Sequence, residues 1–300
     1  MISYYKRSVK DKALEVLENF SVGSWISVVN PTQEELKLLS DRFGLDEQNL
    51  LSGLDRNEVP RIEFEDGLTY IIVKILSRDA GFLDTCLIVV SDRYILTLSR
   101  AEPLFTRKIL DGKIDLFTTQ RLKTLIKFLS LISKEFEKET MESVRIVNAK
   151  KSESEEMPEK DLRLLLHHEE KLNSYISSYT YMKPIYERML KKTRFFEDDK
   201  EMIEDLLIDS EQGLDICRSS LKTISNIRNY QTIILSNKTS RTITTLTIVT
   251  IFFSIFTAIF GFYGMNIPLP FQDSPYAYAL IAVFSFLAGL AIAAYLKKEL

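Results

Sequence analysis

Charged and apolar positions divide this chain into two parts. Charged residues are frequent up to Arg241, whereas none lies between Thr242 and Gln272 or between Ser274 and Leu296. A helix needs about 20 mostly apolar residues to cross the ~30 Å hydrocarbon core of a bilayer. Each uncharged run is long enough, so the pattern predicts two C-terminal transmembrane helices. If the two runs formed a buried hairpin of a soluble protein instead, every face of both helices would have to be hidden.

The N-terminal region alternates strand-like segments with turn signals, which indicates an α/β domain over residues 1–117. The stretch WISVVNPTQEEL predicts a strand that ends at Asn30-Pro31, followed by a helix. Thr32 and Glu35 have the spacing of a capping box at the start of that helix. Ser-Asp-Arg between two runs rich in Ile, Val and Leu predicts a β-hairpin within DTCLIVVSDRYILTLS.

After this domain the apolar period becomes helical. Leu122, Leu125, Leu129 and Ile132 share one face of a predicted helix, and Pro184 is expected to interrupt or kink the helix that follows. From Asp198 to Phe262 the chain contains no proline and only two glycines. A single helix of about sixty residues would be ~90 Å long at ~1.5 Å per residue. With so many polar positions it needs partners, most simply other copies of itself.

The predicted fold class is therefore α+β, with a long stalk helix that continues into the membrane and two C-terminal transmembrane helices. The predicted segments are a cytoplasmic α/β domain (1–117), a cytoplasmic helical pair (118–197), the stalk helix (198–241), the first transmembrane helix (242–263), an outer loop (264–275), the second transmembrane helix (276–296) and a basic cytoplasmic tail (297–300).

Orientation follows from lysine and arginine. Lys238 and Arg241 precede the first span, Lys297 and Lys298 follow the second, and the loop between the spans has neither residue type. The positive-inside rule then puts both termini in the cytoplasm of a multi-pass protein of the cell (inner) membrane.

Composition excludes several classes of function. The net charge is −3 with no basic stripe, which argues against a nucleic-acid partner. The two cysteines, Cys86 and Cys217, lie on different segments and imply no disulfide framework. No phosphate loop, nucleophile elbow or zinc-protease motif is present, so we do not expect an enzyme. His167 and His168 precede two glutamates and are expected to be solvated.

The first span carries small and hydroxylated residues in two rows with a seven-residue repeat. Such a face is either a tight helix-packing surface or the lining of a pore, and the residues alone leave both open. Because two helices cannot enclose a water-filled path, conduction would require oligomerisation. The two rows are Ser240, Thr247, Ser254 and Gly261, and Ile243, Thr250, Thr257 and Gly264.

Two further sites suggest cation chemistry. Gly264-Met265-Asn266 follows the first span, and a ring of asparagine carbonyl oxygens could hold a cation that keeps its water, which Mg²⁺ gives up reluctantly. The predicted stalk helix begins with an acidic stretch. Asp205 and Asp209 lie too far from the start of this helix to be explained by stabilisation of its dipole. A divalent-cation role competes there with ordinary surface charge.

These features together resemble the CorA-type divalent cation channels. Gly264-Met265-Asn266 matches the family's Gly-Met-Asn signature at its expected place, before a short outer loop and a final helix. Other segments of the family are similar to WISVVNPTQEELKLLSDRFGL, to RNEVPRIEFEDGLTYIIV and to the basic tail. The resemblance implies a homopentamer in the bilayer, with five first spans around the pore and Asn266 as its outer selectivity ring.

The resemblance also implies roles for individual residues. Leu246 corresponds to the narrow hydrophobic gate, Thr257 to a pore-facing hydroxyl and Ser240 to a polar position near the cytoplasmic end. Asp205 corresponds to a stalk acid that binds regulatory Mg²⁺ between subunits, with Asp79 or Asp84 as its candidate partner.

The chain departs from the family pattern at several positions. Ile243 and Ser254 stand where relatives often have gate methionines, the proline common in the first span is missing, and the outer loop has one acid, Asp273. Selectivity among Mg²⁺, Co²⁺ and Ni²⁺ therefore stays open.

The main hypothesis is passive Mg²⁺ influx, with Co²⁺ or Ni²⁺ as further ions and gating by cytoplasmic divalent cation. One alternative is a zinc-transporting branch of the same architecture, and another is a non-conducting membrane-anchored sensor or scaffold. A proton-coupled transporter would need an ionisable residue inside a span, and none lies between Arg241 and Asp273.

Overall fold

The computed structural model describes residues 1–76, 83–152, 157–268, 270 and 275–299. Asp79 and Asp273 lie outside the described residues, as do the side chains of Lys297 and Lys298. The chain divides into two compact units, residues 1–226 and 227–300. The long helix α6 (Glu197–Tyr263) begins in the first unit and ends in the second.

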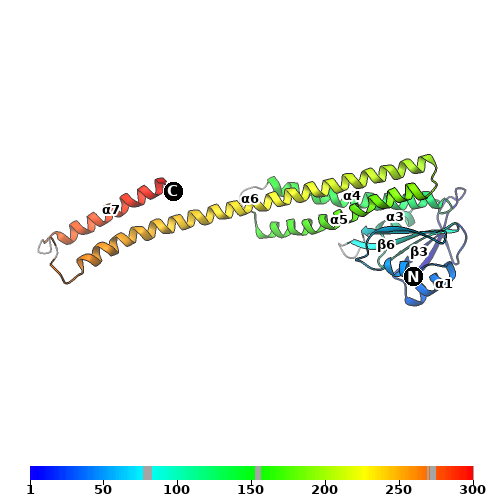
Figure 1. The fold of residues 1–300 in the computed structure, drawn as a ribbon, viewed down its shortest axis with the longest axis horizontal. Helices are drawn as coiled ribbons and strands as arrows, with labels where there is room; N and C mark the ends of the chain where they lie inside the picture. Colours follow the sequence, from blue (N-terminus) through cyan, green and yellow to red (C-terminus); the bar gives the residue numbers. More distant parts are fainter. Residues whose placement is uncertain (77–82, 153–156, 269, 271–274, 300) are drawn as a thin grey trace. The chain divides into compact units, whose positions relative to one another are not determined.

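The first unit contains a seven-stranded sheet with strand order β2-β1-β3-β7-β6-β5-β4 (Figure 1). β3 and β7 pair in parallel, and the other neighbouring strands pair antiparallel. The predicted hairpin is confirmed, since β6 and β7 flank Ser91–Arg93 with Val90 opposite Ile95. The strands are β1 (Ile2–Lys6), β2 (Glu15–Leu17), β3 (Ser24–Val29), β4 (Arg61–Glu65), β5 (Leu68–Leu76), β6 (Leu83–Val90) and β7 (Tyr94–Ser99).

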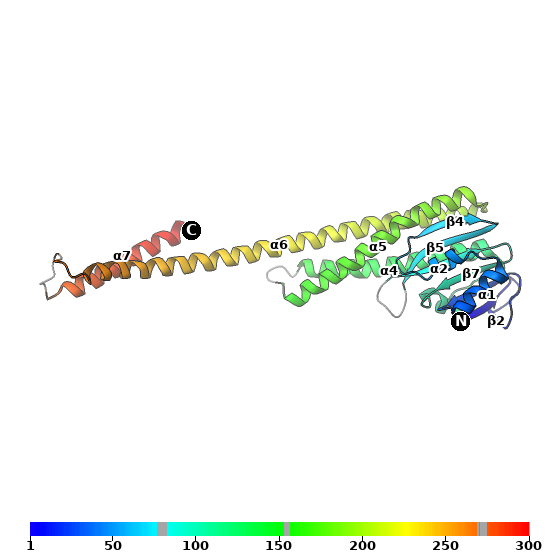
Figure 2. The same ribbon diagram turned by 60° about the horizontal axis from the view of Figure 1, so that its bottom comes forward.

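Successive side chains of each strand point to opposite faces of the sheet, and both faces are buried. On one face Ile26, Leu87 and Leu96 pack against α1 (Gln33–Phe43) and α2 (Glu47–Ser52) (Figure 2). On the other face Trp25 contacts Phe128 of α4 (Arg121–Ser152), with ring centroids 5.2 Å apart. Both faces are covered, which explains why the central strands are almost continuously apolar.

The predicted capping box at the start of α1 is confirmed. Thr32 Oγ1 accepts a hydrogen bond from the Glu35 amide at 3.2 Å, and the Glu35 carboxylate accepts one from the Thr32 amide at 2.9 Å. The helix ends at Gly44, whose φ of 65° is one that glycine adopts without strain.

Helices α3 (Leu104–Leu110), α4 (Arg121–Ser152) and α5 (Glu159–Lys192) follow the sheet. Two expectations can be compared with these helices. Pro184 does not interrupt α5, because it lies inside one continuous helix. His168 is not solvated: its side chain is buried and its Nδ1 is 3.1 Å from Ser143 Oγ of α4.

Within the first unit, α6 buries a residue at alternating spacings of four and three, the periodicity of coiled-coil packing. The opposite side carries most of its charged residues, including Asp205. The buried positions are Asp199, Ile203, Leu206, Ser210, Gly213, Cys217, Ser220 and Ile224.

The second unit holds the rest of α6 and the final helix α7 (Ala277–Glu299). Among the described residues, two helices are long and apolar enough to cross a membrane: α6 and, within α7, Tyr278–Leu296. The predicted fold class is confirmed: an N-terminal sheet domain, one very long helix and two C-terminal apolar helices.

Candidate pore-lining face and acidic sites

Aromatic residues define the side of α6 that meets α7. Phe252 and Phe256 lie 6.0 and 6.5 Å from the ring of Phe286 on α7. Gly289 of α7 makes room for Phe252, because a Cβ atom at Gly289 would come within 2.9 Å of that ring. Close packing here therefore depends on an aromatic residue on one helix and a missing side chain on the other.

The predicted small and hydroxylated face lies on the opposite side of α6. The residues turned toward α7 are partly buried, whereas those of the predicted face are exposed within the chain. At 3.6 residues per turn, the two sets occupy opposite sides of the same helix. The exposed set is Ile243, Leu246, Thr247, Thr250, Ser254, Thr257 and Gly261, with Ser240 exposed near one edge of it.

Three hydroxyl groups on this face donate their protons to the helix itself. Thr250 Oγ1 donates to the Leu246 carbonyl at 2.8 Å, Ser254 Oγ to Thr250 at 2.9 Å and Thr257 Oγ1 to Phe253 at 3.1 Å. A hydroxyl oxygen has two lone pairs as well as its one proton. With the proton bonded back to the helix, what each side chain presents outward is acceptor capacity.

The Gly-Met-Asn segment begins one residue after α6 ends at Tyr263. Its backbone continues the last turn, since the Gly264 amide donates to the Phe260 carbonyl at 2.9 Å and Met265 donates to Phe262 at 3.3 Å. Gly264 is not among the described glycines with positive φ. A Cβ atom there would lie 3.3 Å from the Phe260 carbonyl oxygen, so glycine gives close backbone approach rather than an unusual angle. Asn266 is exposed.

The three candidate metal-binding acids that the structure describes are not gathered into one site within the chain. Asp205 and Asp209 are exposed on α6. Asp84 is buried in β6: its Oδ1 is 3.9 Å from Arg56 Nε and its Oδ2 has no hydrogen-bond partner among the described residues. Across the described part of the chain, no three His, Cys, Asp or Glu side chains are grouped so that they could hold a metal ion.

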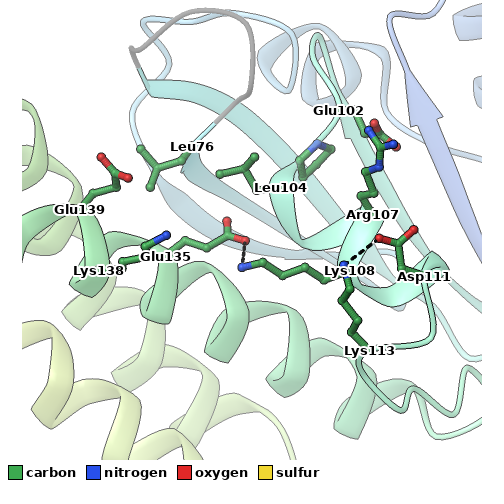
Figure 3. A pocket seen from close by; sticks show the side chains of 11 residues that line it. Leu76, Glu102, Leu104, Arg107, Lys108, Asp111, Lys113, Glu135, Lys138 and Glu139 are labelled. Atoms are coloured by element: carbon green, nitrogen blue, oxygen red, sulfur yellow. Dashed lines mark hydrogen bonds and ion pairs between the residues drawn. The ribbon is translucent and has the colours of Figure 1, made fainter. Parts of the chain in front are cut away.

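A cavity of about 500 Å³ that no sequence pattern predicts opens between α3 and α4 (Figure 3). Glu135 of α4 is 6% exposed there, and its carboxylate accepts a hydrogen bond from Lys108 Nζ of α3 at 3.0 Å. Burial raises the pKa of Glu135, against the opposing effect of Lys108. The two residues are 27 positions apart, so no local pattern indicates that they meet.

Comparison with known proteins gives a consistent result. A family model described as CorA-like Mg²⁺ transporter protein matches residues 21–298. A curated relative, the cobalt/magnesium transport protein CorA of Methanocaldococcus jannaschii, is 24% identical over 273 residues, covering 86% of this chain and 84% of the relative.

Solved structures share the fold. The complete CorA magnesium transporter from Methanocaldococcus jannaschii matches with a TM-score of 0.82 at 21% identity, over 98% of this chain and 96% of the other. The full-length CmaX protein matches with a TM-score of 0.72 at 15% identity, over 96% and 95%. The cytoplasmic domain of ZntB from Vibrio parahaemolyticus matches with a TM-score of 0.58 at 9% identity, over 79% and 98%.

Proposed function

Because this chain belongs to the family of CorA-like Mg²⁺ transporter proteins, which are membrane transporters and not enzymes, we propose that it forms a homopentameric channel for passive Mg²⁺ influx. Co²⁺ and Ni²⁺ are further candidate ions. The observation that carries the proposal is the division of α6 into two faces. Its aromatic side packs against α7, and its hydroxylated side is left uncovered within the chain.

The uncovered face suits a hydrated divalent cation. The water molecules around such a cation turn their hydrogens outward and act as hydrogen-bond donors. Thr250, Ser254 and Thr257 direct their own protons to helix carbonyls and present lone pairs. Several copies of α6 around one axis would therefore form a tube of acceptors without fixed charge, which favours hydrated cations over anions and does not trap them.

The proposed outer selectivity ring consists of one Asn266 from each subunit. Gly264 and Met265 fix the position of Asn266. One amide oxygen per subunit could accept hydrogen bonds from the water around the ion. Since Mg²⁺ loses its inner water reluctantly, a ring that contacts the hydrated ion avoids that cost.

Membrane potential supplies the driving force. Moving one charge through 100 mV changes the free energy by about 2.3 kcal/mol, so a divalent ion gains about 4.6 kcal/mol on entering an inside-negative cell. No fuel is required. The proposed location is the cell (inner) membrane with both termini in the cytoplasm.

Closure is proposed to depend on cytoplasmic divalent cation. Exposed Leu246 and Ile243 would form the hydrophobic gate, and Asp205 would bind regulatory Mg²⁺ with an acid from a neighbouring subunit. Asp84 would have to leave its buried position to act as that acid, because only 1% of it is exposed. Asp79 is the other candidate for that acid, and Asp209 is a further candidate metal ligand on α6 itself. Mg²⁺ can shift the equilibrium between the open and the closed channel only if it binds the two states with different affinities.

The first test is Mg²⁺ entry into proteoliposomes under an imposed inside-negative potential, comparing the native chain with Asn266→Ala. We expect flux to collapse in this variant while the assembly stays intact by size-exclusion chromatography. Ile267→Val is the matched control, since it keeps the amide ring and should conduct normally.

Two other results would redirect the proposal. Equal flux in Asn266→Ala and the native chain would mean that selectivity lies elsewhere. An intact native assembly that carries none of Mg²⁺, Co²⁺, Ni²⁺ and Zn²⁺ would favour a sensor or scaffold, and preference for Zn²⁺ would favour the zinc-transporting branch.

A further inference from the structure

The cavity between α3 and α4 has apolar as well as charged walls (Figure 3). Leu76 at the end of β5, Pro103 and Leu104 supply the apolar part. The volume of about 500 Å³ lies within the roughly 300–1,000 Å³ of typical small-molecule sites. The space therefore suits a ligand that has both a polar and an apolar portion.

Glu135 is the most buried charged residue that lines this cavity, with 6% of it exposed. Its Oε1 accepts the hydrogen bond from Lys108 Nζ, whereas its Oε2 accepts none from a described residue. Figure 3 shows this second oxygen turned away from Lys108, toward the side on which Leu76 and Leu104 lie. A carboxylate can accept about four hydrogen bonds, and burying one without donors is costly. A ligand with an N–H donor at this point would supply the missing hydrogen bond.

Ion pairs neutralise three of the four carboxylates that line the cavity. Besides the Glu135 pair, Asp111 Oδ2 is 3.1 Å from Lys113 Nζ, and Glu139 Oε2 is 3.1 Å from Lys171 Nζ. The charges of these residues are therefore already balanced by partners within the protein.

The other charged residues of the lining are Arg107, Lys138 and Glu102, which form no ion pair with a described residue. Two positive charges against one negative charge leave a surplus that favours an anionic ligand over a polyamine. Arg107 lies in the last turn of α3, where a positive charge also complements the helix dipole. Lys138 lies in the middle of α4, where the dipole gives no such reason, and its charge acts on Glu135.

We propose that this cavity is a binding site for a nucleotide whose base carries an amino group. The base lies against the apolar wall, and its amino group donates to Glu135 Oε2. The phosphate group accepts hydrogen bonds from Arg107, whose planar guanidinium can contact two phosphate oxygens at once, and Lys138 adds positive charge from α4. A free amino acid also combines an anion with an amino group, but it has no ring to fill the apolar part. The proposal does not depend on the channel function, because one folded chain provides the whole site.

Equilibrium dialysis of the full-length protein in detergent against radiolabelled AMP tests the site, with EDTA present to exclude effects of Mg²⁺. The competitors are unlabelled AMP, adenosine, which lacks the phosphate, and ribose 5-phosphate, which lacks the base. We expect each fragment to bind at least about tenfold more weakly than AMP, because each loses one of the two charged contacts.

Three results would overturn the proposal. The first is that the protein retains no AMP. The second is that ribose 5-phosphate competes as well as AMP, which would remove the role of the base and of Glu135. The third is that adenosine competes as well as AMP, which would remove the role of the phosphate and of Arg107.

Two variants test the contacts separately. Arg107→Ala should abolish the advantage of AMP over adenosine. Glu135→Gln should abolish the advantage of AMP over ribose 5-phosphate, since an amide NH₂ group would then face the amino group of the base. A general loss of structure would not divide the two ligand preferences in this way, and unchanged preferences in both variants would contradict the proposal.

Lys134→Ala is the matched control for Lys138→Ala. Both substitutions remove an exposed lysine of α4, but only Lys138 lines the cavity. We expect Lys138→Ala to weaken AMP binding and Lys134→Ala to bind AMP like the native chain. An equal loss in the two variants would mean that AMP is attracted by surface charge in general, which would reject the site.

Discussion

At the residue scale, His168 links the packing of the helical bundle to pH. Its ring is buried against Ser143. Burial lowers the pKa of His168, and the positive charges of Lys171 and His167 act in the same direction, while Glu142 and Glu139 oppose them. The imidazole is therefore held neutral in the folded protein at pH values where the unfolded chain would be protonated.

We predict that this histidine makes the protein less stable in mild acid. Below pH 6.5 the unfolded chain takes up a proton that the folded chain excludes, so stability falls with pH by at most about 1.4 kcal/mol per unit. The apparent Tm of the full-length protein should drop more between pH 7.5 and 5.5 than that of His168→Gln. Identical slopes for the two proteins would show that His168 does not carry the effect.

Some residue contacts could be predicted from the local sequence alone. Thr32 and Glu35 were predicted to cap α1 because both partners of the box lie within one turn, and the hydrogen bonds are present. His168 was misjudged from its polar neighbours, and Pro184 was expected to disturb α5. For His168 the deciding contact is with Ser143 of another helix and not with adjacent residues.

At the scale of elements, the hairpin of α6 and α7 depends on the fit of Phe252 over Gly289. A larger residue at position 289 would displace the aromatic ring and separate the helices. The fit also decides which side of α6 remains for other subunits.

We predict that Gly289→Leu lowers the Tm of the detergent-solubilised assembly, since overpacking typically costs about 1–3 kcal/mol. Adding Phe252→Ala should recover part of the loss, and the double-mutant cycle should give a coupling energy of about 0.5–3 kcal/mol. Leu287→Ala, at an exposed neighbouring position on α7, serves as the control. Simple additivity of Gly289→Leu and Phe252→Ala would mean that the two residues do not depend on each other.

At the scale of the whole molecule, the proposed regulation requires that ions bind between subunits. Asp205 is exposed on the side of α6 away from its own helical bundle, which leaves it free to meet a neighbouring subunit. A ligand that binds only the assembled state stabilises it by RT ln(1 + [L]/Kd), about 2.7 kcal/mol at a hundredfold excess over Kd.

We therefore predict that Asp205→Asn weakens inhibition of flux by Mg²⁺ on the cytoplasmic side, because it removes the charge that binds the ion. Asp205→Lys, which reverses that charge, should weaken it further. Asp215→Asn, which removes another exposed α6 carboxylate, should keep normal inhibition. Flux and its inhibition are both measured in the proteoliposome assay, with the inhibiting Mg²⁺ added to the cytoplasmic side of the protein. If Asp205→Asn and the native protein close at the same Mg²⁺ concentration, regulation does not use Asp205.

The order of charged and apolar residues was sufficient to define the two apolar helices, the long uninterrupted α6, the hairpin before residue 100 and the composition of the hydroxylated face. Those features depend on the period of the backbone and on the length needed to cross a bilayer, which are local properties. The meeting of Lys108 with Glu135, the burial of Asp84 and His168, and the fit of Tyr179 against Gly213 depended on the folded chain. Each joins residues from different elements, and such contacts are set by how helices and strands pack, which no local pattern specifies.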